Sequence, residues 1–288
     1  MEIALIQAPY WLGNPELPMA AGPTRIVEAG AAEALRAAGH EVELVSVETD
    51  RDPGERGYSN EIKDSFEVMG LVAAEVRAAG ERGALPIVLA TNCFNTVGIV
   101  AGGGADVGVV WFDAHGDFST TDSTLSGFLD GVGLSMLTGT GWKALCETIP
   151  GYRAVPEERV VHVGARDTDD DEEERFARSA ISVVRADEID DRLAAALDAL
   201  RERIADVHVH LDLDVLDRSE GMVNRYAAEG GPSQDTVVGA IHAIGKRFRI
   251  RSAALTAYDP SADAEGRVPP IAVRLLGEIA AAAERSAG

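Results

Sequence analysis

The sequence predicts an α/β protein built around a mostly parallel β-sheet with helices on both faces. Short apolar strands alternate with longer helical segments along the whole chain, which is the pattern of repeated strand–helix–strand units. The 288 residues are enough for a large core, and no Pro/Gly/Ser-rich linker or internal repeat divides them. We therefore expect a single domain over residues 1–288.

The first half of the chain shows this alternation clearly. Apolar residues that recur every three or four positions predict the helices, and Gly39 is a natural end for the first of them. The expected elements are, in order, strand 2–9, helix 24–39, strand 41–47, helix 63–80, strand 85–91, a helix that begins at 96–103, and strand 106–115.

The second half continues in the same way. A short apolar strand at 180–189 is expected to lead directly into the next helix. The expected elements are strands 159–166 and 180–189, helix 192–205, strand 207–217, helix 233–247, strand 250–260 and helix 271–287.

Charge and cysteine content limit the function classes. A net charge of −22 argues against nucleic acid or an anionic membrane as partner, because both require surfaces rich in Lys and Arg. Cys93 and Cys146 are far apart and form no CxxC motif, which favours a reducing compartment. The N-terminus lacks the features of a signal peptide, and no apolar run approaches the roughly 20 residues of a membrane span. We expect a soluble, cytoplasmic protein that acts on a small molecule.

Ionisable side chains follow the strand expected at 106–115. In parallel sheets, ligands bind beyond the carboxyl ends of the strands, which is where Asp113, His115 and Asp117 lie. Alternate residues of an extended chain face the same side. The three side chains therefore converge if the extended form persists that far.

A second group of the same kind lies on strand 207–217, where His208 and His210 precede Asp212 and Asp214. Buried carboxylates are costly unless they are paired or bind a metal, so one or two divalent cations are expected. Oxygen ligands with some imidazole suit Mn²⁺, and Mg²⁺, Fe²⁺ or Zn²⁺ less well. A single D-x-H pair is often a cap or turn, but two such groups favour a metal site. His208 is expected in the core, and His210 behind the ligands, where it orients an Asp or a bound water.

Two motifs resemble those of a known family. DAHGD at 113–117, followed by LDLDVLD at 211–217, is similar to the paired motifs of the ureohydrolase superfamily, which includes arginases, agmatinases and formimidoylglutamases. The resemblance extends over nearly the whole chain. The further similar stretches are an N-terminal loop and helix at 22–42, a strand–loop–helix at 86–102, a substrate-side loop at 162–173 and a last-strand motif at 254–263.

The resemblance implies a three-layer α/β sandwich of the arginase type that holds two Mn²⁺ ions. By position, Asp113 and Asp212 would bridge the ions, Asp117 would bind one of them, and His115 and Asp214 would bind the other. The implied reaction is attack of metal-bound hydroxide on a planar C–N carbon, which gives urea or an amide plus an amine. His115 and Asp117 are therefore catalytic candidates as well as ligands. Homo-oligomers, trimers or hexamers, are usual in the family.

The chain departs from the family pattern at three positions. Cys93 stands where the family's first motif has a histidine ligand; as a soft ligand it favours Zn²⁺ or Fe²⁺, and the alternative is a plain buried cysteine. Asp130 aligns with the arginase histidine that relays protons, and it is a candidate general acid or base, or a partner for a cationic substrate group. The other interpretation of Asp130 is a loop carboxylate in water. Ala257 replaces the glutamate that grips guanidinium, so arginine and agmatine should bind poorly unless another carboxylate takes over.

Four further residues are substrate-binding candidates through the resemblance. Ser119 and Ser126 fall where arginases hold the substrate carboxylate, and Asp169 and Glu172 fall where they hold the amino end. We therefore expect a metal-dependent hydrolase of a non-peptide C–N bond in a guanidino, formimidoyl or related amidine compound. Two alternatives stay open: a metal-binding family member with little catalysis, and an amide or deacetylase-type hydrolase on the same scaffold.

Overall fold

The structure is a computed structural model that describes residues 1–49, 57–104, 106–120 and 127–287. Its centre is an 8-stranded sheet in the order β2-β1-β3-β8-β7-β4-β5-β6, and every pair of neighbouring strands is parallel. The strands are β1 Glu2–Ala8, β2 Glu41–Ser46, β3 Leu85–Ala90, β4 Gly108–Phe112, β5 Val160–Ala165, β6 Ser182–Arg185, β7 Asp206–Asp212 and β8 Arg249–Thr256.

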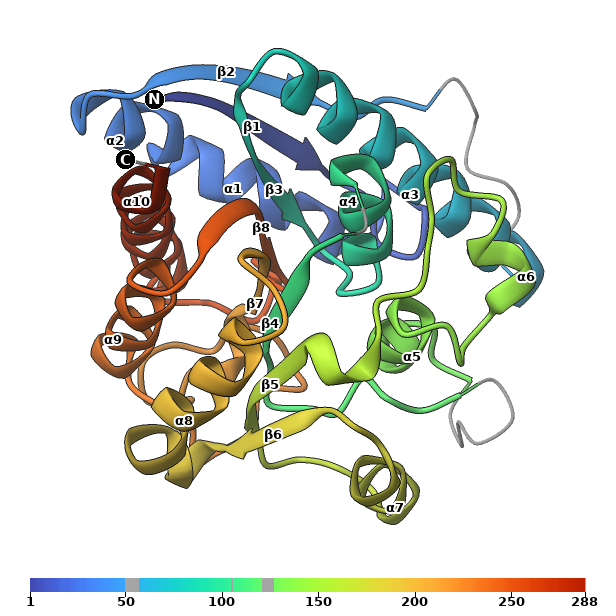
Figure 1. The fold of residues 1–288 in the computed structure, drawn as a ribbon. Helices are drawn as coiled ribbons and strands as arrows, with labels where there is room; N and C mark the ends of the chain where they lie inside the picture. Colours follow the sequence, from blue (N-terminus) through green and yellow to red (C-terminus); the bar gives the residue numbers. More distant parts are fainter. Residues whose placement is uncertain (50–56, 105, 121–126, 288) are drawn as a thin grey trace.

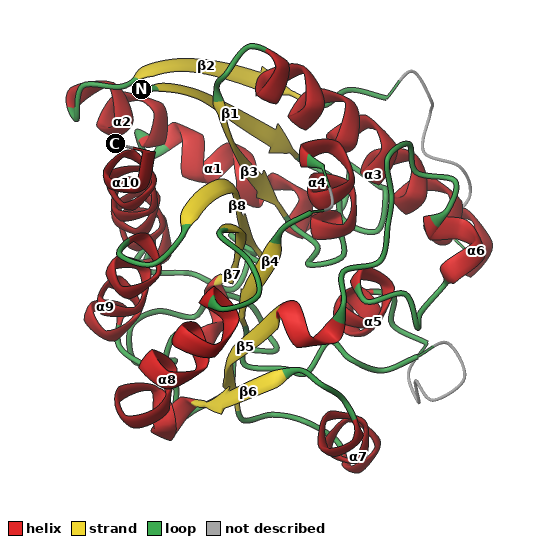
Figure 2. Ribbon diagram, viewed as in Figure 1, coloured by secondary structure: helices red, strands yellow, loops and turns green. Residues whose placement is uncertain are grey.

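Helices cover both faces of the sheet, so the expected three-layer α/β sandwich is confirmed (Figures 1 and 2). One layer packs into the larger core cluster and contains α1 Gly22–Glu28, α2 Ala31–Ala37, α8 Ile189–Arg201, α9 Gln234–Gly245 and α10 Val268–Ala287. The opposite layer contains α3 Tyr58–Glu81, α4 Asn95–Gly103, α5 Gly133–Leu137, α6 Lys143–Cys146 and α7 Asp170–Arg178.

The prediction of one helix over 24–39 is wrong in one respect, because the chain forms two helices there, α1 and α2. The backbone of Gly30 takes a φ of 96°, in the left-handed region that interrupts a helix. Gly30 still accepts a hydrogen bond at its carbonyl from the amide of Ala34, so the second helix begins at once. Glycine enters this conformation without the steric cost that a side chain would add.

The short helices α5, α6 and α7 were not expected. The first two are 5 and 4 residues long, too short for an apolar period to mark them. The third begins with a capping box, in which Asp169 accepts from the amide of Glu172 and Glu172 accepts from the amide of Asp169.

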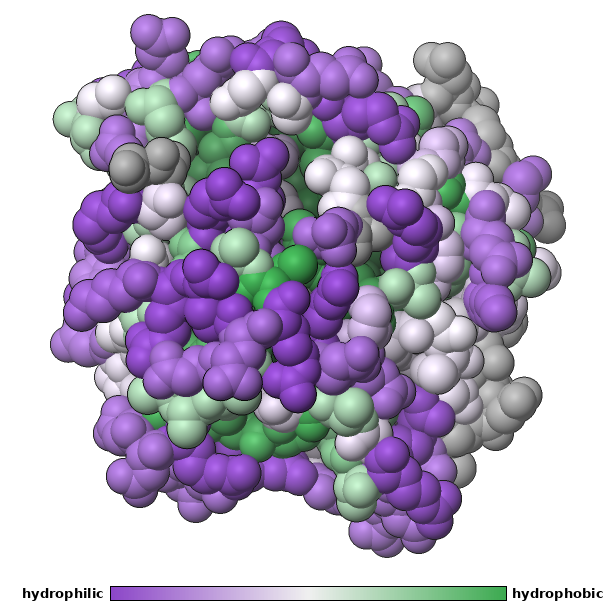
Figure 3. Space-filling view, in the orientation of Figure 1, coloured by the Kyte–Doolittle hydropathy of each residue, from purple (hydrophilic) through white to green (hydrophobic). Residues whose placement is uncertain are grey.

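The central strands place the two acidic motifs side by side. β4 pairs with β7, with Trp111 opposite His210 and Phe112 opposite Leu211. All residues of β4 are buried, so the polar groups that follow Phe112 emerge directly from the core at the carboxyl end of the sheet. The exterior differs in character: Figure 3 shows hydrophilic residues over most of one face, with apolar residues visible mainly between them. In the described part of the chain, no helix has the length and apolar character that crossing a bilayer requires.

Candidate metal centre

A cavity of about 310 Å³ lies at the carboxyl ends of the central strands. Its described lining contains no Lys or Arg. The acidic residues in that lining are Asp117, Asp130, Asp167, Asp169, Glu172, Asp212 and Asp214. A pocket with this balance of charge attracts cations, either metal ions or the positive group of a substrate.

The first acidic motif reaches the cavity through a turn and not through an extended ladder. β4 ends at Phe112, ahead of the expected strand end at His115, and Asp117 has a φ of 48°, so the extended form does not persist to Asp117. Asp113 is held at the strand end, where its Oδ1 accepts from the amide of His115 at 2.8 Å and its Oδ2 accepts from Trp111 Nε1 at 3.2 Å. The turn still brings His115 and Asp117 to the cavity wall.

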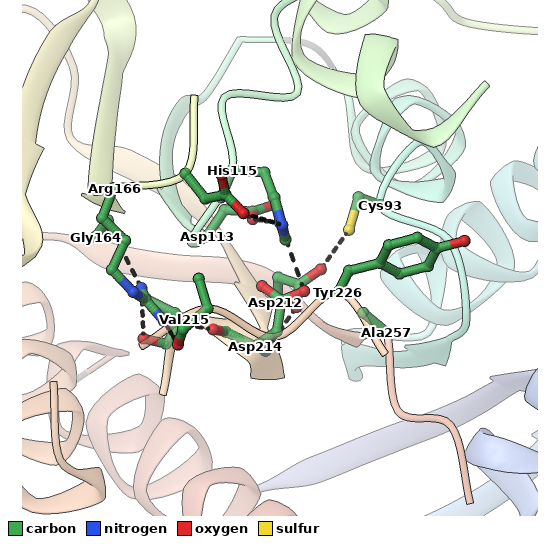
Figure 4. A network of polar contacts seen from close by, with 12 residues as sticks. Cys93, Asp113, His115, Gly164, Arg166, Asp212, Asp214, Val215, Tyr226 and Ala257 are labelled. Carbon is green, nitrogen blue, oxygen red and sulfur yellow. Dashed lines mark hydrogen bonds and ion pairs between the residues drawn. The ribbon is translucent and has the colours of Figure 1, made fainter. Parts of the chain in front are cut away.

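The second acidic motif is fixed by a short 3-10 helix, Leu213–Val215, that directly follows β7. Asp212 caps this helix, and its Oδ1 accepts from the amide of Asp214 at 2.7 Å. Asp214 Oδ2 accepts from Asn224 Nδ2 at 3.0 Å. His115 joins the two motifs, because its Nδ1 lies 3.3 Å from Asp113 Oδ1 and 3.5 Å from Asp214 Oδ2 (Figure 4).

The loop that carries Asp214 is fastened by Arg166, a residue that sequence reasoning missed. The guanidinium of Arg166 donates to main-chain carbonyl oxygens at 3.0–3.2 Å. These acceptors belong to Gly164, Asp214, Val215, Leu216, Ala228 and Glu229. Figure 4 labels the first three beside Arg166. The arginine therefore positions the loop and leaves the carboxylates free for a ligand.

Burial and mutual repulsion make this cluster unfavourable without a cation. Burial raises the pKa of Asp113, Asp117 and Asp212, and neighbouring carboxylates raise each pKa further. Asp214 behaves differently, since burial works to raise its pKa but the charge and hydrogen bond of His115 lower it. Burial in turn opposes a charge on His115, but Asp214 and Asp113 outweigh it and raise the pKa of His115.

Two carboxylate oxygens in the cluster are buried without a hydrogen-bond partner, Asp117 Oδ2 and Asp214 Oδ1. Buried anionic oxygens of this kind are rare unless a metal or an ordered water satisfies them. The donor set therefore fits divalent cations, which would take the place of the proton that His115 otherwise carries.

Two overlapping groups of side chains have ligand atoms within 4.8 Å of one another. One group is Cys93, Asp113 and His210, and the other is Asp113, His115 and Asp214. Asp113 belongs to both, which suits a pair of neighbouring ions that share one carboxylate.

Cys93 is buried beyond the end of β3, at the first of these groups. Its Sγ lies 2.8 Å from Asp212 Oδ2 and 3.3 Å from Thr256 Oγ1. Burial raises the pKa of the thiol well above its ordinary value, and the carboxylates of Asp212 and Asp130 add to the effect. A cation at this position would reverse that balance and favour the thiolate.

Asp130 is held in the cavity wall by Asn92 and by the segment that carries Cys93. Its Oδ2 accepts from Asn92 Nδ2 at 2.7 Å, and its Oδ1 accepts from the amide of Phe94 at 3.4 Å. Burial raises the pKa of Asp130 to about 7, and its hydrogen bonds with Asn92 and Phe94 limit the rise. Asp130 is 8% exposed, which disagrees with its interpretation as a loop carboxylate in water.

The substrate-side candidates have different surroundings. Ser119 is buried and lines the cavity, and Ser126 lies outside the described residues. Asp169 and Glu172 line the cavity while they form the capping box of α7. Glu172 also accepts from the amide of Phe118 at 3.1 Å, so it supports the loop after the first motif.

The two histidines of β7 have similar surroundings but different neighbours. Both are fully buried, and burial lowers the pKa of His208 to about 3 and the pKa of His210 well below its ordinary value. His208 Nδ1 lies 2.8 Å from Ser252 Oγ, whereas His210 Nδ1 lies 2.7 Å from Thr96 Oγ1. His210 makes no hydrogen bond with a carboxylate among the contacts described; it belongs instead to the Cys93 group.

Two amides, Asn92 and Asn224, complete the site and were not identified from the sequence. Asn224 Nδ2 bridges Asp214 Oδ2 and the carbonyl of Ala257, at 3.0 and 2.9 Å. A neutral side chain in a loop carries no charge pattern that would single it out. The position of Asn92 directly before Cys93 was the one available signal.

Comparison with known proteins gives consistent matches over the whole fold. A family model described as the arginase family matches residues 1–282. The arginase of Bacillus caldovelox is 29% identical, over 96% of this chain and 97% of that protein. A crystal structure of arginase from Bacillus subtilis superposes with a TM-score of 0.86 at 26% identity, covering 97% of this chain and 98% of that one. Formimidoylglutamase from Bacillus subtilis shares the fold at 16% identity, with a TM-score of 0.74 over 98% of this chain and 86% of that one.

Proposed function

The chain belongs to the arginase family, and on that premise we propose that it is a metal-dependent hydrolase of a non-peptide C–N bond. The proposed substrates are guanidino, formimidoyl or related amidine compounds. The similarity to the arginase of Bacillus caldovelox supports this substrate class. The observation that carries the proposal is the pair of ligand groups sharing Asp113 at an acid-lined cavity.

The residues that would hold two divalent cations fall into two sets. Cys93 and Asp117 would serve the first ion, and His115 and Asp214 would serve the second. Asp113 and Asp212 would lie between them. When bound, divalent cations supply a water that is nucleophilic at neutral pH and positive charge that stabilises the transition state.

The chain's own groups would bind the substrate and move protons. The described lining of the cavity is acidic and contains no Lys or Arg, which favours a positively charged substrate group. Asp130 faces this cavity from a fixed position, and because burial raises the pKa of its carboxyl group, Asp130 would exchange a proton with the leaving amine. Ala257, which presents only a methyl group, cannot grip a guanidinium, so Asp130 is the candidate for that contact too.

The remaining lining residues would fix the other end of the substrate. Ser119 offers a hydroxyl, and Asp169 and Glu172 offer carboxylates on the side of α7. Ser126 keeps its role as a candidate from the sequence. The finer expectations also form part of the proposal: Mn²⁺ as the main ion with Zn²⁺ or Fe²⁺ as alternatives, a cytoplasmic location, and a trimer or hexamer. Sedimentation of the purified protein tests the last.

The proposal is tested by metal content and by products. Elemental analysis of protein purified without chelator should give two divalent ions per chain. Metal-loaded protein is then incubated with guanidino, formimidoyl and acetylated amine compounds, and urea, ammonia and acetate are measured. Urea or ammonia release that disappears with chelator supports the proposal. Acetate as the sole product indicates a deacetylase, and metal binding without any product indicates a binding protein; either result would overturn the proposed reaction.

A further inference from the structure

We propose that His210 is a direct ligand, together with Cys93 and Asp113, of the ion nearest β3, and that this ligand set makes that position suited to Zn²⁺. The inference deepens the proposed function, on which it rests for the presence of two cations. It gives His210 a different role from the orienting one expected from the sequence.

The ring of His210 is aimed and immobilised by its surroundings. Its Nδ1 is engaged by Thr96 Oγ1 at 2.7 Å, in the first turn of α4. The ring stacks on Trp111, with centroids 3.7 Å apart and planes inclined by 23°. These two contacts fix the ring and leave Nε2 as the nitrogen available to a ligand.

His210 Nε2 is buried and has no hydrogen-bond partner among the residues that the structure describes. A bare imidazole nitrogen in the core is costly unless it meets a donor or a metal ion. In the described part of the chain, Cys93 and Asp113 are the side chains whose ligand atoms lie within 4.8 Å of a ring nitrogen of His210 and of each other. All three are buried, so an ion bound there would be shielded from water.

His208 shows that burial alone does not produce this arrangement. It lies two residues earlier on the same strand, is equally buried, and also pairs Nδ1 with a hydroxyl, that of Ser252. Its Nε2 is likewise without a partner. However, His208 belongs to neither of the groups that could hold a metal. The two histidines therefore form a matched pair that differs in proximity to Cys93.

The chemistry of the three ligands sets the choice of metal. A thiolate, an imidazole and a carboxylate are ligands that Zn²⁺ takes in tetrahedral sites, with Zn–S about 2.3 Å and Zn–N about 2.0–2.1 Å. Mn²⁺ prefers oxygen-rich sets, such as Asp113, His115 and Asp214 on the other side. The two positions should thus differ in metal preference, with Zn²⁺ at the first and Mn²⁺ at the second.

The test uses Co²⁺ as a visible probe for the zinc position in the full-length protein. His210→Asn keeps a polar group near Thr96 and removes the Nε2 ligand; His208→Asn is the matched control. One equivalent of Co²⁺ should give wild type and the control a sulfur-to-cobalt charge-transfer band. His210→Asn should lose more than about 100-fold in affinity at this position, beyond the 10–100-fold that loss of an orienting group costs.

Two results would overturn the inference: wild-type affinity and spectrum in His210→Asn, or a loss of 100-fold or less. If that variant fails to fold, zinc-edge X-ray absorption of wild type with one Zn²⁺ decides the matter. One sulfur and one imidazole on the same ion support the inference, and sulfur without imidazole refutes it. If the protein hydrolyses C–N bonds but binds metal equally well without His210, this inference alone is refuted. If metal binding depends on His210 but no C–N bond is hydrolysed, the proposed function alone is refuted.

Discussion

Cys93 Sγ lies 2.8 Å from Asp212 Oδ2, although β8 lies between β3, which Cys93 follows, and β7, which Asp212 ends. The contact passes over the end of β8, where Thr256 Oγ1 lies 3.3 Å from the same sulfur. Three strand ends therefore meet at one point. A ligand bound there would be held by segments that are remote in the sequence and rigid in the fold.

Removing the shared carboxylate should remove the metal. We expect Asp113→Ala to lose both ions and all hydrolytic activity while the secondary structure is kept, because Asp113 belongs to both ligand groups. Elemental analysis, circular dichroism and product assays measure the three quantities. Asp198→Ala, at an exposed carboxylate paired with Arg247, is the control and should keep two ions. A full metal content in Asp113→Ala would refute the assignment.

Asp130 should impose a pH dependence on the stability of the metal-free protein. Burial raises its pKa from 3.8 to about 7, so the folded state binds this proton more tightly than the unfolded state does. The resulting stabilisation is complete below pH 3.8 and is lost as the pH rises through about 7. Asn at this position does not titrate, so Asp130→Asn lacks this loss.

The measurement is the difference in Tm between Asp130→Asn and wild type, in chelator, at a series of pH values. We expect this difference to grow by at least about 2 °C between pH 4 and pH 7, the shift that roughly 1 kcal/mol gives in a large domain. Titrating groups remote from Asp130 cancel in the difference. A flat result for Asp130→Asn would contradict the raised pKa of Asp130.

A carboxylate restored at position 257 should improve the binding of guanidinium compounds. Ala257 lines the cavity, so Ala257→Glu adds a charged acceptor there. A hydrogen bond to a charged group contributes about 1.5–3 kcal/mol, which corresponds to about tenfold or more in affinity. Inhibition constants of guanidinium compounds measure the effect. Ala257→Gln is the control. Glutamine has the same size as glutamate and must accommodate the same φ of 67°, but it carries no charge and should not improve guanidinium binding.

Replacing Arg166 by lysine should remove most of the hydrogen bonds that hold the Asp214 loop. Lysine offers a compact ammonium in place of a planar fork, so several carbonyl oxygens lose their donor. We expect Arg166→Lys to lower stability by at least about 2 kcal/mol and to weaken metal retention on dialysis. Arg218→Lys is the control, because Arg218 lies in the same region and forms a 3.6 Å ion pair with the exposed Glu229. Equal effects of the two substitutions would contradict this role for Arg166.

The sheet and the two acidic motifs could be predicted because their signals are strong. A continuous apolar run marked β4, and apolar residues alternating with His208 and His210 marked β7; carboxylates at the strand ends stood out against that background. The geometry within the motif could not be predicted, because Asp117 reaches the cavity through a left-handed turn and not through strand alternation. Gly116 lets Glu172 approach the turn closely, since a Cβ at Gly116 would meet Glu172 Oε1 at 2.6 Å.

Other features depend on contacts between distant parts of the chain. The pairing of Asn92 with Asp130 joins residues 38 apart, and that of Asn224 with Ala257 joins residues 33 apart. No local pattern encodes such contacts. The break at Gly30 is a different case: a single glycine in a helical pattern is often tolerated, so the sequence favours a continuous helix. Asp169 and Glu172 could have been identified as a capping box from their spacing alone.

Arg166 has a consequence for how the protein is handled. Because its guanidinium donates to main-chain oxygens, the carboxylate oxygens of the acidic cluster remain available to divalent ions. The metal-free protein should therefore take up divalent ions from its surroundings. The metal content of a purified sample would then record the growth medium and the buffers, and a comparison between preparations requires that the protein be stripped and reloaded under defined conditions.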